Sequence, residues 1–364
     1  AASDVYKRQI IQGTSFAFIP IMLPFKAFGL GAIFTAAFIG GIFQIWIGKM
    51  LKPIRHMFPP LVTGIVVLMI GISLLKVGFK YAGGGVWLMN NKPEIFGNWE
   101  HLLIAGTVLI VALLCNLRGK GMVSSASILI GIIAGFVMAT LLGEVRFEKI
   151  AAAGWFAFPM PFQYGIDFVW GAVILMLFMS VVTTIETIGD ISATTMGGAN
   201  REATDKELSG GIMADGVGTA FASIFNAMPN TSYSQNAGLV AFTGVISRHV
   251  GTVAGVILIL LGLFPKLGGV IAAMPDSVIG GAAIIMFGLI AGAGIKLISK
   301  AEMSQRNILI LSLSLSFGIG LYAFPEFVAH VPDLGIKLGL LLTTGLIPAG
   351  LLAFILNATL PNKK

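Results

Sequence analysis

Apolar runs of about 20 residues, the length of a membrane-spanning helix, recur along the whole of this 364-residue chain. Of its residues, 56% are hydrophobic and only 11% are charged, whereas soluble domains carry about 25% charged residues. This much apolar surface does not fit into one soluble core. The runs also have helical lengths, unlike the roughly ten-residue alternating strands of a membrane barrel. We therefore expect an all-α polytopic membrane protein.

About twelve membrane segments are expected from these runs. The first and the eighth contain polar residues and should be broken helices. The expected segments are 10–25, 28–48, 58–78, 101–115, 123–143, 167–188, 207–224, 225–244, 250–268, 275–298, 305–324 and 337–357.

Residues 226–244 form a polar stretch between apolar runs. Pro229 within it lacks a backbone donor and disfavours helix immediately before it. Because lipid offers no hydrogen bonds, this stretch must contact protein, water or a ligand, and we expect it to hold a ligand. Its polar side chains are those of Asn226, Asn230, Thr231, Ser232, Ser234, Gln235 and Asn236.

Two pairs of similar sequences are separated by almost the same distance. Thr14-Ser15-Phe16 matches Thr231-Ser232-Tyr233. Residues 58–64 resemble residues 274–280, which follow them at almost the same offset along the sequence. Apolar sequences also match by chance, but two nearly equal offsets favour a duplicated unit. The offset spans an odd number of expected segments, so the second copy should be inverted. Inverted repeats with paired broken helices are typical of secondary transporters. We therefore expect residues 12–16 to face the polar stretch of residues 226–244.

Three carboxylates are candidates for chemistry: Glu186 and Asp190 at the end of the expected segment 167–188, and Asp215 within the expected segment 207–224. Glu186 and Asp190 are four residues apart and share one face of a helix. Intramembrane carboxylates usually mark a functional site, although a carboxylate at a helix end can also be solvated by headgroups. Burial favours the protonated carboxyl group, which suits coupling of transport to protons. Asp215 lies among small residues, where it either positions the broken segment or caps a helix.

Amide and aromatic side chains near the polar stretch fit a planar polar ligand. Gln235 and Asn236 each carry a donor and an acceptor. An amide can form two hydrogen bonds with the edge of a nucleobase, as it does with adenine in DNA; the alternative is that these amides satisfy the backbone of a broken helix. Phe16 and Tyr233 either stack on a ring or only pack.

Several other classes of function are disfavoured. The single cysteine, Cys115, excludes a disulfide scaffold and a cysteine-built metal site within one chain. The net charge of +7 comes from basic residues spread over short loops, which indicates membrane topology and no nucleic-acid binding. The sequence contains no nucleophile–base constellation of an enzyme, no phosphate loop and no ring of carbonyls or charges typical of a channel.

Residues 235–244, Gln-Asn-Ala-Gly-Leu-Val-Ala-Phe-Thr-Gly, closely resemble the signature of the nucleobase–ascorbate transporter family. That signature is Gln, Glu or Pro, then Asn, any residue, Gly, four further residues, Thr, and Arg, Lys or Gly. Every fixed position is met. Glu186 with Asp190, and Asp215, resemble the carboxylates of the family's eighth and ninth helices, and residues 12–16 its third helix. The resemblance covers the chain beyond about residue 10.

The resemblance implies two inverted seven-helix repeats with short extended stretches in helices three and ten. About 12 of the 14 helices would be present, because helices one and two are absent. It also implies a core domain of residues 10–57 and 166–268 and a gate domain of residues 58–145 and 269–357. By the same resemblance, the core would move like an elevator within a homodimer. We expect residues 1–9 to be a non-native extension, since they contain neither a start methionine nor a signal-peptide pattern.

The resemblance also assigns site residues. The base would be bound by the side chains of Glu186 and Gln235, with Phe16, Ser15 and the backbone near Ser234 as further contacts. The supporting or proton-coupling residues would be Glu186, Asp190, Asp215, Asn236 and Tyr233. No cofactor and no metal is implied. The coupling ion would be H⁺, with Na⁺ left open.

Gln235 resembles the purine branch of the family, so the expected substrate is xanthine or uric acid imported by proton symport. The expected location is the bacterial inner (plasma) membrane, and the distribution of basic residues over the loops favours a cytoplasmic C-terminus. The alternatives are a uracil or pyrimidine permease, which tends to carry Glu at this position, and an anion exchanger of the same fold. The exchanger is disfavoured because the polar stretch contains no Lys or Arg.

Overall fold

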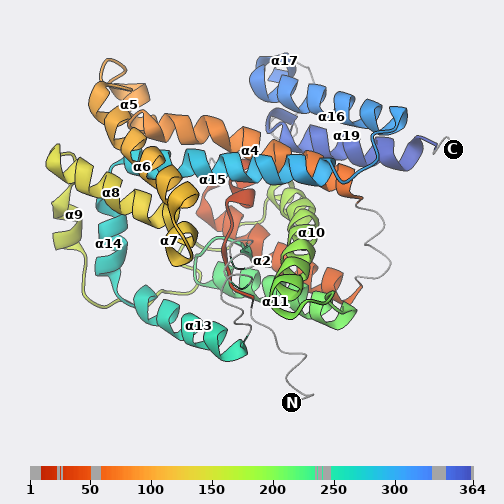
Figure 1. Ribbon diagram of the computed structural model, residues 1–364, viewed down its shortest axis with the longest axis horizontal. Helices are drawn as coiled ribbons and strands as arrows, with labels where there is room; N and C mark the ends of the chain where they lie inside the picture. The colour runs from red at the N-terminus through yellow and green to blue at the C-terminus, as the bar shows by residue number, and fades with distance from the viewer. Residues whose placement is uncertain are drawn as a thin grey trace. The chain divides into compact units, whose positions relative to one another are not determined.

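The computed structural model describes residues 10–22, 25, 28–50, 59–233, 236, 240, 247–329 and 342–361. Almost all of its regular structure is helical, with two short strands (Figure 1). The elements, in chain order, are β1 (Gln12–Thr14), the 3₁₀ turn η2 (Phe16–Phe18), α1 (Ile19–Met22), α2 (Leu30–Lys49), α4 (Pro60–Ala82), α5 (Val86–Asn91), α6 (Trp99–Arg118), α7 (Met122–Ser125), α8 (Ser127–Leu141), α9 (Phe147–Ala152), α10 (Trp170–Ala199), α11 (Asp205–Ile224), β2 (Asn230–Ser232), α13 (Arg248–Gly262), α14 (Pro265–Ala273), α15 (Asp276–Ile298), α16 (Gln305–Ala323), α17 (Glu326–Ala329) and α19 (Leu346–Thr359).

Six helices in the described part of the chain are long and apolar enough to cross a membrane: α2, α4, α6, α10, α15 and α16. The shorter helices α8 and α19 are also apolar. These helices coincide with expected segments, so the prediction of a helical multi-pass membrane protein is confirmed. The first expected segment consists of β1, η2 and α1, and the eighth begins with β2. The prediction that these two segments are broken is therefore also confirmed.

One expected segment differs from the structure. Residues 250–268 were predicted as one continuous helix, whereas α13 ends at Gly262 and α14 begins at Pro265, with a bend of 77° between them. Proline has no N–H to continue a helical ladder and disfavours helical conformation in the residue before it. It is well suited to the first turn of a new helix. Only together are the two helices long and apolar enough to enter a membrane, as a broken span or a re-entrant loop.

The second predicted pair of repeated sequences leads into matching helices. α4 begins at Pro60 and α15 at Asp276, the equivalent position in the repeat, and both helices have 23 residues. The two helices run in opposite directions where they pack: a Cβ on Gly64 would lie 2.8 Å from Ile298 N, and one on Gly71 would lie 2.5 Å from Ala291 N. Two equivalent helices packed antiparallel are consistent with the inverted repeat.

The residues group into two compact units. One comprises residues 1–73, 160–246 and 290–364, and the other residues 74–159 and 247–289. The division into core and gate domains concerns movement during transport, and it stays a prediction. Residues 1–9, predicted to be a non-native extension, lie outside the described residues.

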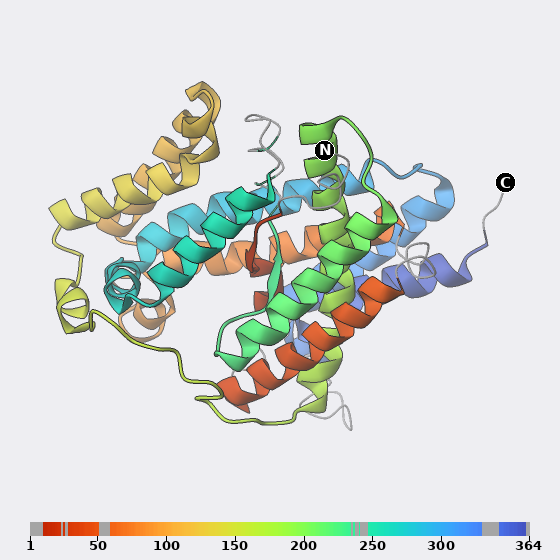
Figure 2. The ribbon, with the colours of Figure 1, turned by 90° about the horizontal axis from the view of Figure 1, so that it is seen from below.

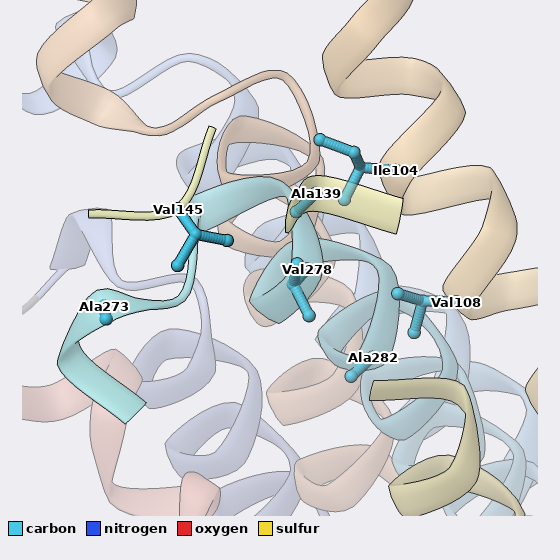
Figure 3. Packing of buried hydrophobic residues seen from close by; sticks show 7 residues of the cluster. All are labelled: Ile104, Val108, Ala139, Val145, Ala273, Val278 and Ala282. Carbon is cyan, nitrogen blue, oxygen red and sulfur yellow. The ribbon is translucent and has the colours of Figure 1, made fainter. Parts of the chain in front are cut away.

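In the second unit, a hydrophobic cluster joins α6, α8, α14 and α15. Figure 3 shows its seven buried side chains, with Val278 of α15 near their centre. Each is at most 9% exposed, so nearly all of its apolar surface is packed against other parts of the protein. The members are Ile104, Val108, Ala139, Val145, Ala273, Val278 and Ala282.

In the first unit, glycines allow α2 to pack closely on α11, and the two helices run side by side in Figure 2 (α2 orange-red, α11 green). A Cβ on Gly216 would lie 2.6 Å from the carbonyl oxygen of Gly41, and one on Gly41 would lie 2.7 Å from that of Gly216. The Ser209 hydroxyl donates to the carbonyl of Gly48 at 2.7 Å. Close backbone approach through small residues is how membrane helices gain packing energy without a hydrophobic driving force.

Gly216→Ala should therefore destabilise the protein. The added methyl group meets backbone atoms that cannot rotate away, and overpacking of this kind costs about 1–3 kcal/mol. Thermal unfolding in detergent measures the effect. Gly210→Ala is the matched control on the same helix, because a Cβ there meets nothing within 4 Å. Equal melting temperatures for the two variants would contradict the close packing of α2 on α11.

The connection from α10 to α11 is fixed by local hydrogen bonds. Asn200 ends α10 in the left-handed conformation, with φ of 50°. Thr204 and Glu207 form a capping box at the start of α11: Thr204 N donates to Glu207 Oε2 at 2.8 Å, and Glu207 N donates to Thr204 Oγ1 at 3.3 Å. Arg201 Nη2 lies 2.6 Å from Glu207 Oε1. These contacts fix the ends of the two helices that carry the three intramembrane carboxylates.

Candidate functional site

The two broken segments meet as a pair of antiparallel strands. Gln12 of β1 pairs with Ser232 of β2, Gly13 with Thr231, and Thr14 with Asn230. Two backbone hydrogen bonds extend this ladder, from Ser15 N to Pro229 O at 3.1 Å and from Tyr233 N to Ile11 O at 3.0 Å. The pairing satisfies backbone groups that no helix satisfies here, as a membrane interior requires. The prediction that residues 12–16 face the polar stretch is confirmed.

Ser232 connects β2 to the carboxylates of α10 and α11. Its hydroxyl donates to Asp190 Oδ2 at 2.9 Å and lies 3.3 Å from the hydroxyl of Thr187. The Thr187 hydroxyl in turn donates to Asp215 Oδ2. All four side chains are at most 7% exposed. The structure thus brings Asp190 and Asp215 together through two hydroxyl groups and fixes β2 against both helices.

Glu186 is the accessible carboxylate of this group. It lies one helical turn before Asp190 and is partly exposed. The charges of Asp190 and Asp215 both act on it, so the three carboxylates form one electrostatic cluster. Its carboxylate has no hydrogen bond to another described residue, whereas those of Asp190 and Asp215 are held by hydroxyl groups. Glu186 is therefore the carboxylate most available to a ligand.

The aromatic residues lie at the ends of the strand pair. Phe16 and Tyr233 are 39% and 38% exposed, respectively. The Tyr233 hydroxyl donates to Thr14 O at 3.2 Å, and its ring covers Gly13, where a Cβ would lie 2.2 Å from the Tyr233 oxygen. Tyr233 therefore braces the strand pair, while the exposure of Phe16 leaves its ring accessible to a ligand.

Of the other predicted site residues, the structure describes two and leaves two outside the described residues. Ser15 is buried, and its hydroxyl accepts a hydrogen bond from Ala17 N at 3.2 Å, which caps the 3₁₀ turn. Asn236 is 6% exposed, and its backbone N–H donates to Tyr233 O at 2.9 Å. Ser234 and Gln235 lie outside the described residues, so their part in the site stays a prediction.

Thr187 and Thr219 contribute to the site although the sequence did not single them out. Thr187 bridges Asp215 and Ser232, and Thr219 accepts from Asn230 N at 3.0 Å and lies 3.3 Å from Asn230 O. Hydroxyl side chains in helices usually bond to their own helix backbone. The sequence could have indicated Thr187, because it follows Glu186 directly and lies between the two carboxylates of α10. Thr219 had none, because its partner depends on the tertiary fold.

A cavity of about 230 Å³ with a mixed polar and apolar lining adjoins the strand pair. Its lining includes Gln12 of β1, Thr194 and Thr195 of α10, and Lys206 and Glu207 of α11. Among the described residues, no group of three or more His, Cys, Asp or Glu side chains is arranged to hold a metal ion.

Comparison with known sequences identifies the family. The sequence model described as "Permease family" (Xan_ur_permease) matches residues 5–327. The chain belongs to this family. It is 38% identical to a putative purine permease of Clostridium perfringens, an alignment that covers 96% of the chain and 76% of that protein. It is 34% identical to the xanthine permease XanP of Escherichia coli, covering 97% and 78%, and 34% identical to the uric acid permease PucJ of Bacillus subtilis, covering 96% and 77%.

Solved structures share the fold of this permease. The transmembrane domain of the cyanobacterial bicarbonate transporter BicA has a TM-score of 0.58 at 17% identity, covering 97% of the permease and 85% of that chain. The murine anion transporter Slc26a9 has a TM-score of 0.64 at 13% identity, covering 86% and 57%. The resemblance to bacterial xanthine and uric acid permeases and the predicted fold class are thus confirmed. The permease is a multi-pass membrane protein.

Proposed function

We propose that this permease is a secondary active transporter that imports a purine nucleobase, xanthine or uric acid, together with protons. The observation that carries the proposal is the strand pair β1–β2 beside Glu186, joined to the carboxylate cluster through Ser232 and Asp190. The named relatives at 34–38% identity are permeases for purines, xanthine and uric acid. The chemistry of the cluster supports both the cargo and the coupling ion.

The site offers the groups that a purine needs. Broken helices leave backbone N–H and C=O groups near their ends, and these match the alternating donors and acceptors of a base edge. Glu186 adds a carboxylate acceptor that accepts no hydrogen bond from another described residue, and Phe16 is 39% exposed. Together with the amide of Gln235, these groups would bind the base by its edge and its face.

Proton coupling follows from the charge of the cluster. The charges of Asp190 and Asp215 both act on Glu186. Three negative charges close together in a poorly solvated site repel one another, so binding of a proton lowers the energy. We propose that Glu186 takes this proton when the base binds. Na⁺ is the alternative coupling ion.

Two other cargoes are less favoured. A uracil or pyrimidine permease of the same family would have the same fold, and Gln235 is the reason to prefer a purine. An anion exchanger shares the fold of BicA and Slc26a9, but at 13–17% identity that likeness extends only to the fold. An anion would also meet three carboxylates at this site. We further propose the bacterial inner membrane as the location, a cytoplasmic C-terminus, and a homodimer whose core moves against its gate.

Uptake of labelled bases by the full-length protein tests the proposed cargo. Xanthine, uric acid and uracil are offered separately to cells that lack their own base transporters. Saturable uptake of xanthine or uric acid, inhibited by the other purine, is the expected result. Saturable uracil uptake without purine uptake would refute the purine assignment.

Gln235→Glu should change the preference between bases. The substitution replaces an amide that donates and accepts by a carboxylate that only accepts, so one hydrogen bond to the preferred base is lost. A lost hydrogen bond of about 1–1.5 kcal/mol lowers the ratio of xanthine to uracil uptake about tenfold. Gln305→Glu, the same change at an exposed position in α16, is the control. An unchanged ratio in Gln235→Glu would count against direct contact with the base.

A further inference from the structure

Gln44 of α2 is wholly buried, with 0% of its surface exposed. Neither its Oε1 nor its Nε2 has a hydrogen-bond partner among the residues that the structure describes. An unsatisfied buried polar group costs about 1–3 kcal/mol, so native proteins almost always provide a partner. The site described above does not involve Gln44.

The packing of α2 shows what Gln44 faces. Gly41, three residues earlier, lies against Gly216 and Ala220 of α11, and Gly48, four residues later, lies against Ser209 and Met213. The two helices are thus antiparallel in this contact. Gln44 shares the face of Gly41 and Gly48, because residues three and four apart in a helix are neighbours. Midway between these two contacts, Gln44 lies level with Asp215.

Asp215 has a matching unpartnered atom. Its Oδ2 accepts from Thr187, whereas its Oδ1 is buried and has no hydrogen-bond partner within the described part of the chain. Gly40 of α2 packs against Ser180 of α10, and the Ser180 hydroxyl donates to the Gly40 carbonyl at 3.0 Å. Gln44 therefore points into the seam between α10 and α11. Three polar atoms there have no hydrogen-bond partner among the described residues: Gln44 Oε1, Gln44 Nε2 and Asp215 Oδ1.

We propose that a water molecule occupies this seam and links Gln44 to Asp215. A water accepts a hydrogen bond from Gln44 Nε2 and donates one to Asp215 Oδ1. Its second hydrogen is donated to Gln44 Oε1 or to another acceptor. A water therefore suits a site that contains both a donor and acceptors. A metal cation would satisfy the oxygens but would face the amide hydrogens of Gln44, which repel it. Gln44 is then a positioning residue that orients the Asp215 carboxylate beneath β2.

The charged groups around this seam are few. On α10 they are Glu186 and Asp190, and on α2 only Lys49, in its last turn. Apart from Asp215, the charged residues of α11, Asp205, Lys206 and Glu207, are in its first turn, and β1 and β2 carry no charge. Glu186 and Asp190 are therefore the nearby charged groups of the cluster, and the Thr187 hydroxyl and the backbone of Ser232 are the neutral groups that also act on Asp215.

A double-mutant cycle of Gln44→Leu and Asp215→Asn tests the link by thermal unfolding of the full-length protein in detergent. Gln44→Leu should lower the melting temperature, and the double variant should lower it by less than the sum of the single shifts, because both changes remove the same water contact. Without the link, leucine would replace an unsatisfied amide and raise the melting temperature. A higher melting temperature, or fully additive shifts, would overturn the proposal. Gln44→Met replaces Gln44→Leu in the cycle if the leucine variant does not fold.

Two controls make the cycle specific. Ser314→Ala should combine additively with Asp215→Asn, because the Ser314 hydroxyl on α16 is also wholly buried and has no hydrogen-bond partner among the described residues. The melting curves are repeated in sodium chloride and in choline chloride. Equal melting temperatures in the two salts support a water molecule. If sodium raises the melting temperature of the wild type but not that of Gln44→Leu, the proposal is overturned in favour of a cation.

For transport, the role of Gln44 rests on the proposed function. Loss of the water removes a hydrogen-bond donor to Asp215, whose charge acts on Glu186, so Gln44→Leu should shift the pH at which uptake is half-maximal. An unchanged pH profile would restrict Gln44 to stability and overturn its positioning role. If the wild type takes up no base at all, the proposed function fails, while the unfolding cycle still decides whether the water link exists.

Discussion

Glu186→Gln should reduce proton-driven purine uptake by about 10- to 100-fold and abolish its dependence on the pH gradient. The glutamine keeps the size of the side chain and an acceptor for the base, but it cannot bind and release a proton. Loss of a hydrogen bond to a charged group costs about 1.5–3 kcal/mol, which sets this range. Uptake of labelled xanthine at several external pH values measures both effects.

Glu148→Gln is the matched control, since Glu148 is an exposed carboxylate on the short helix α9. It should leave the rate and its pH dependence unchanged. The Glu186→Gln variant should also retain more of the exchange of internal for external base in the absence of a pH gradient than of the uptake driven by that gradient. A Glu186→Gln variant that keeps the normal pH dependence would show that Glu186 does not carry the coupled proton.

Asp215→Ala should lower both stability and uptake. Asp215 is 0% exposed, and the Thr187 hydroxyl that donates to it also lies beside Ser232 of β2. Alanine leaves that hydroxyl without its acceptor and opens a space beneath the strand pair, at a cost of about 1–3 kcal/mol. Because β2 then loses its fixed position against α10, we expect uptake to fall at least about tenfold, as a cost of 1.4 kcal/mol at the site implies.

Asp205→Ala provides the comparison on the same helix. Asp205 is exposed in the first turn of α11, where a carboxylate contributes about 0.3–1 kcal/mol through the helix dipole. Its loss should have a small effect on the melting temperature and none on substrate preference. If Asp215→Ala unfolds and transports like Asp205→Ala, the hydroxyl-linked carboxylates do not organise the site.

Much of the fold could be predicted because membrane helices have a strong local signal. Length and hydropathy located α2, α4, α6, α10, α15 and α16, and polar residues with Pro229 located the break that contains β2. The match of Thr14-Ser15-Phe16 with Thr231-Ser232-Tyr233 indicated that the two breaks are related, and in the structure they pair.

The contacts within the site were harder to predict, because they depend on how separate helices meet. Thr187 could have been bonded to its own helix backbone, as Thr183 is to Met179 O. The close approach at Gly41 and Gly216 depends on which faces of two glycine-rich helices meet, and glycine is common throughout the chain. Gln44 gave no signal either, since a single amide in an apolar run can face lipid headgroups, a cavity or a neighbouring helix.

Proton flux measured together with base uptake tests the central claim most directly. The purified full-length protein is placed in liposomes that contain a pH-sensitive dye, in sodium-free buffer, and xanthine or uric acid is added outside. The account predicts that the purine acidifies the interior in the wild type and that Glu186→Gln removes this signal. Purine uptake without acidification, or uptake that requires sodium, would contradict proton symport through the carboxylate cluster.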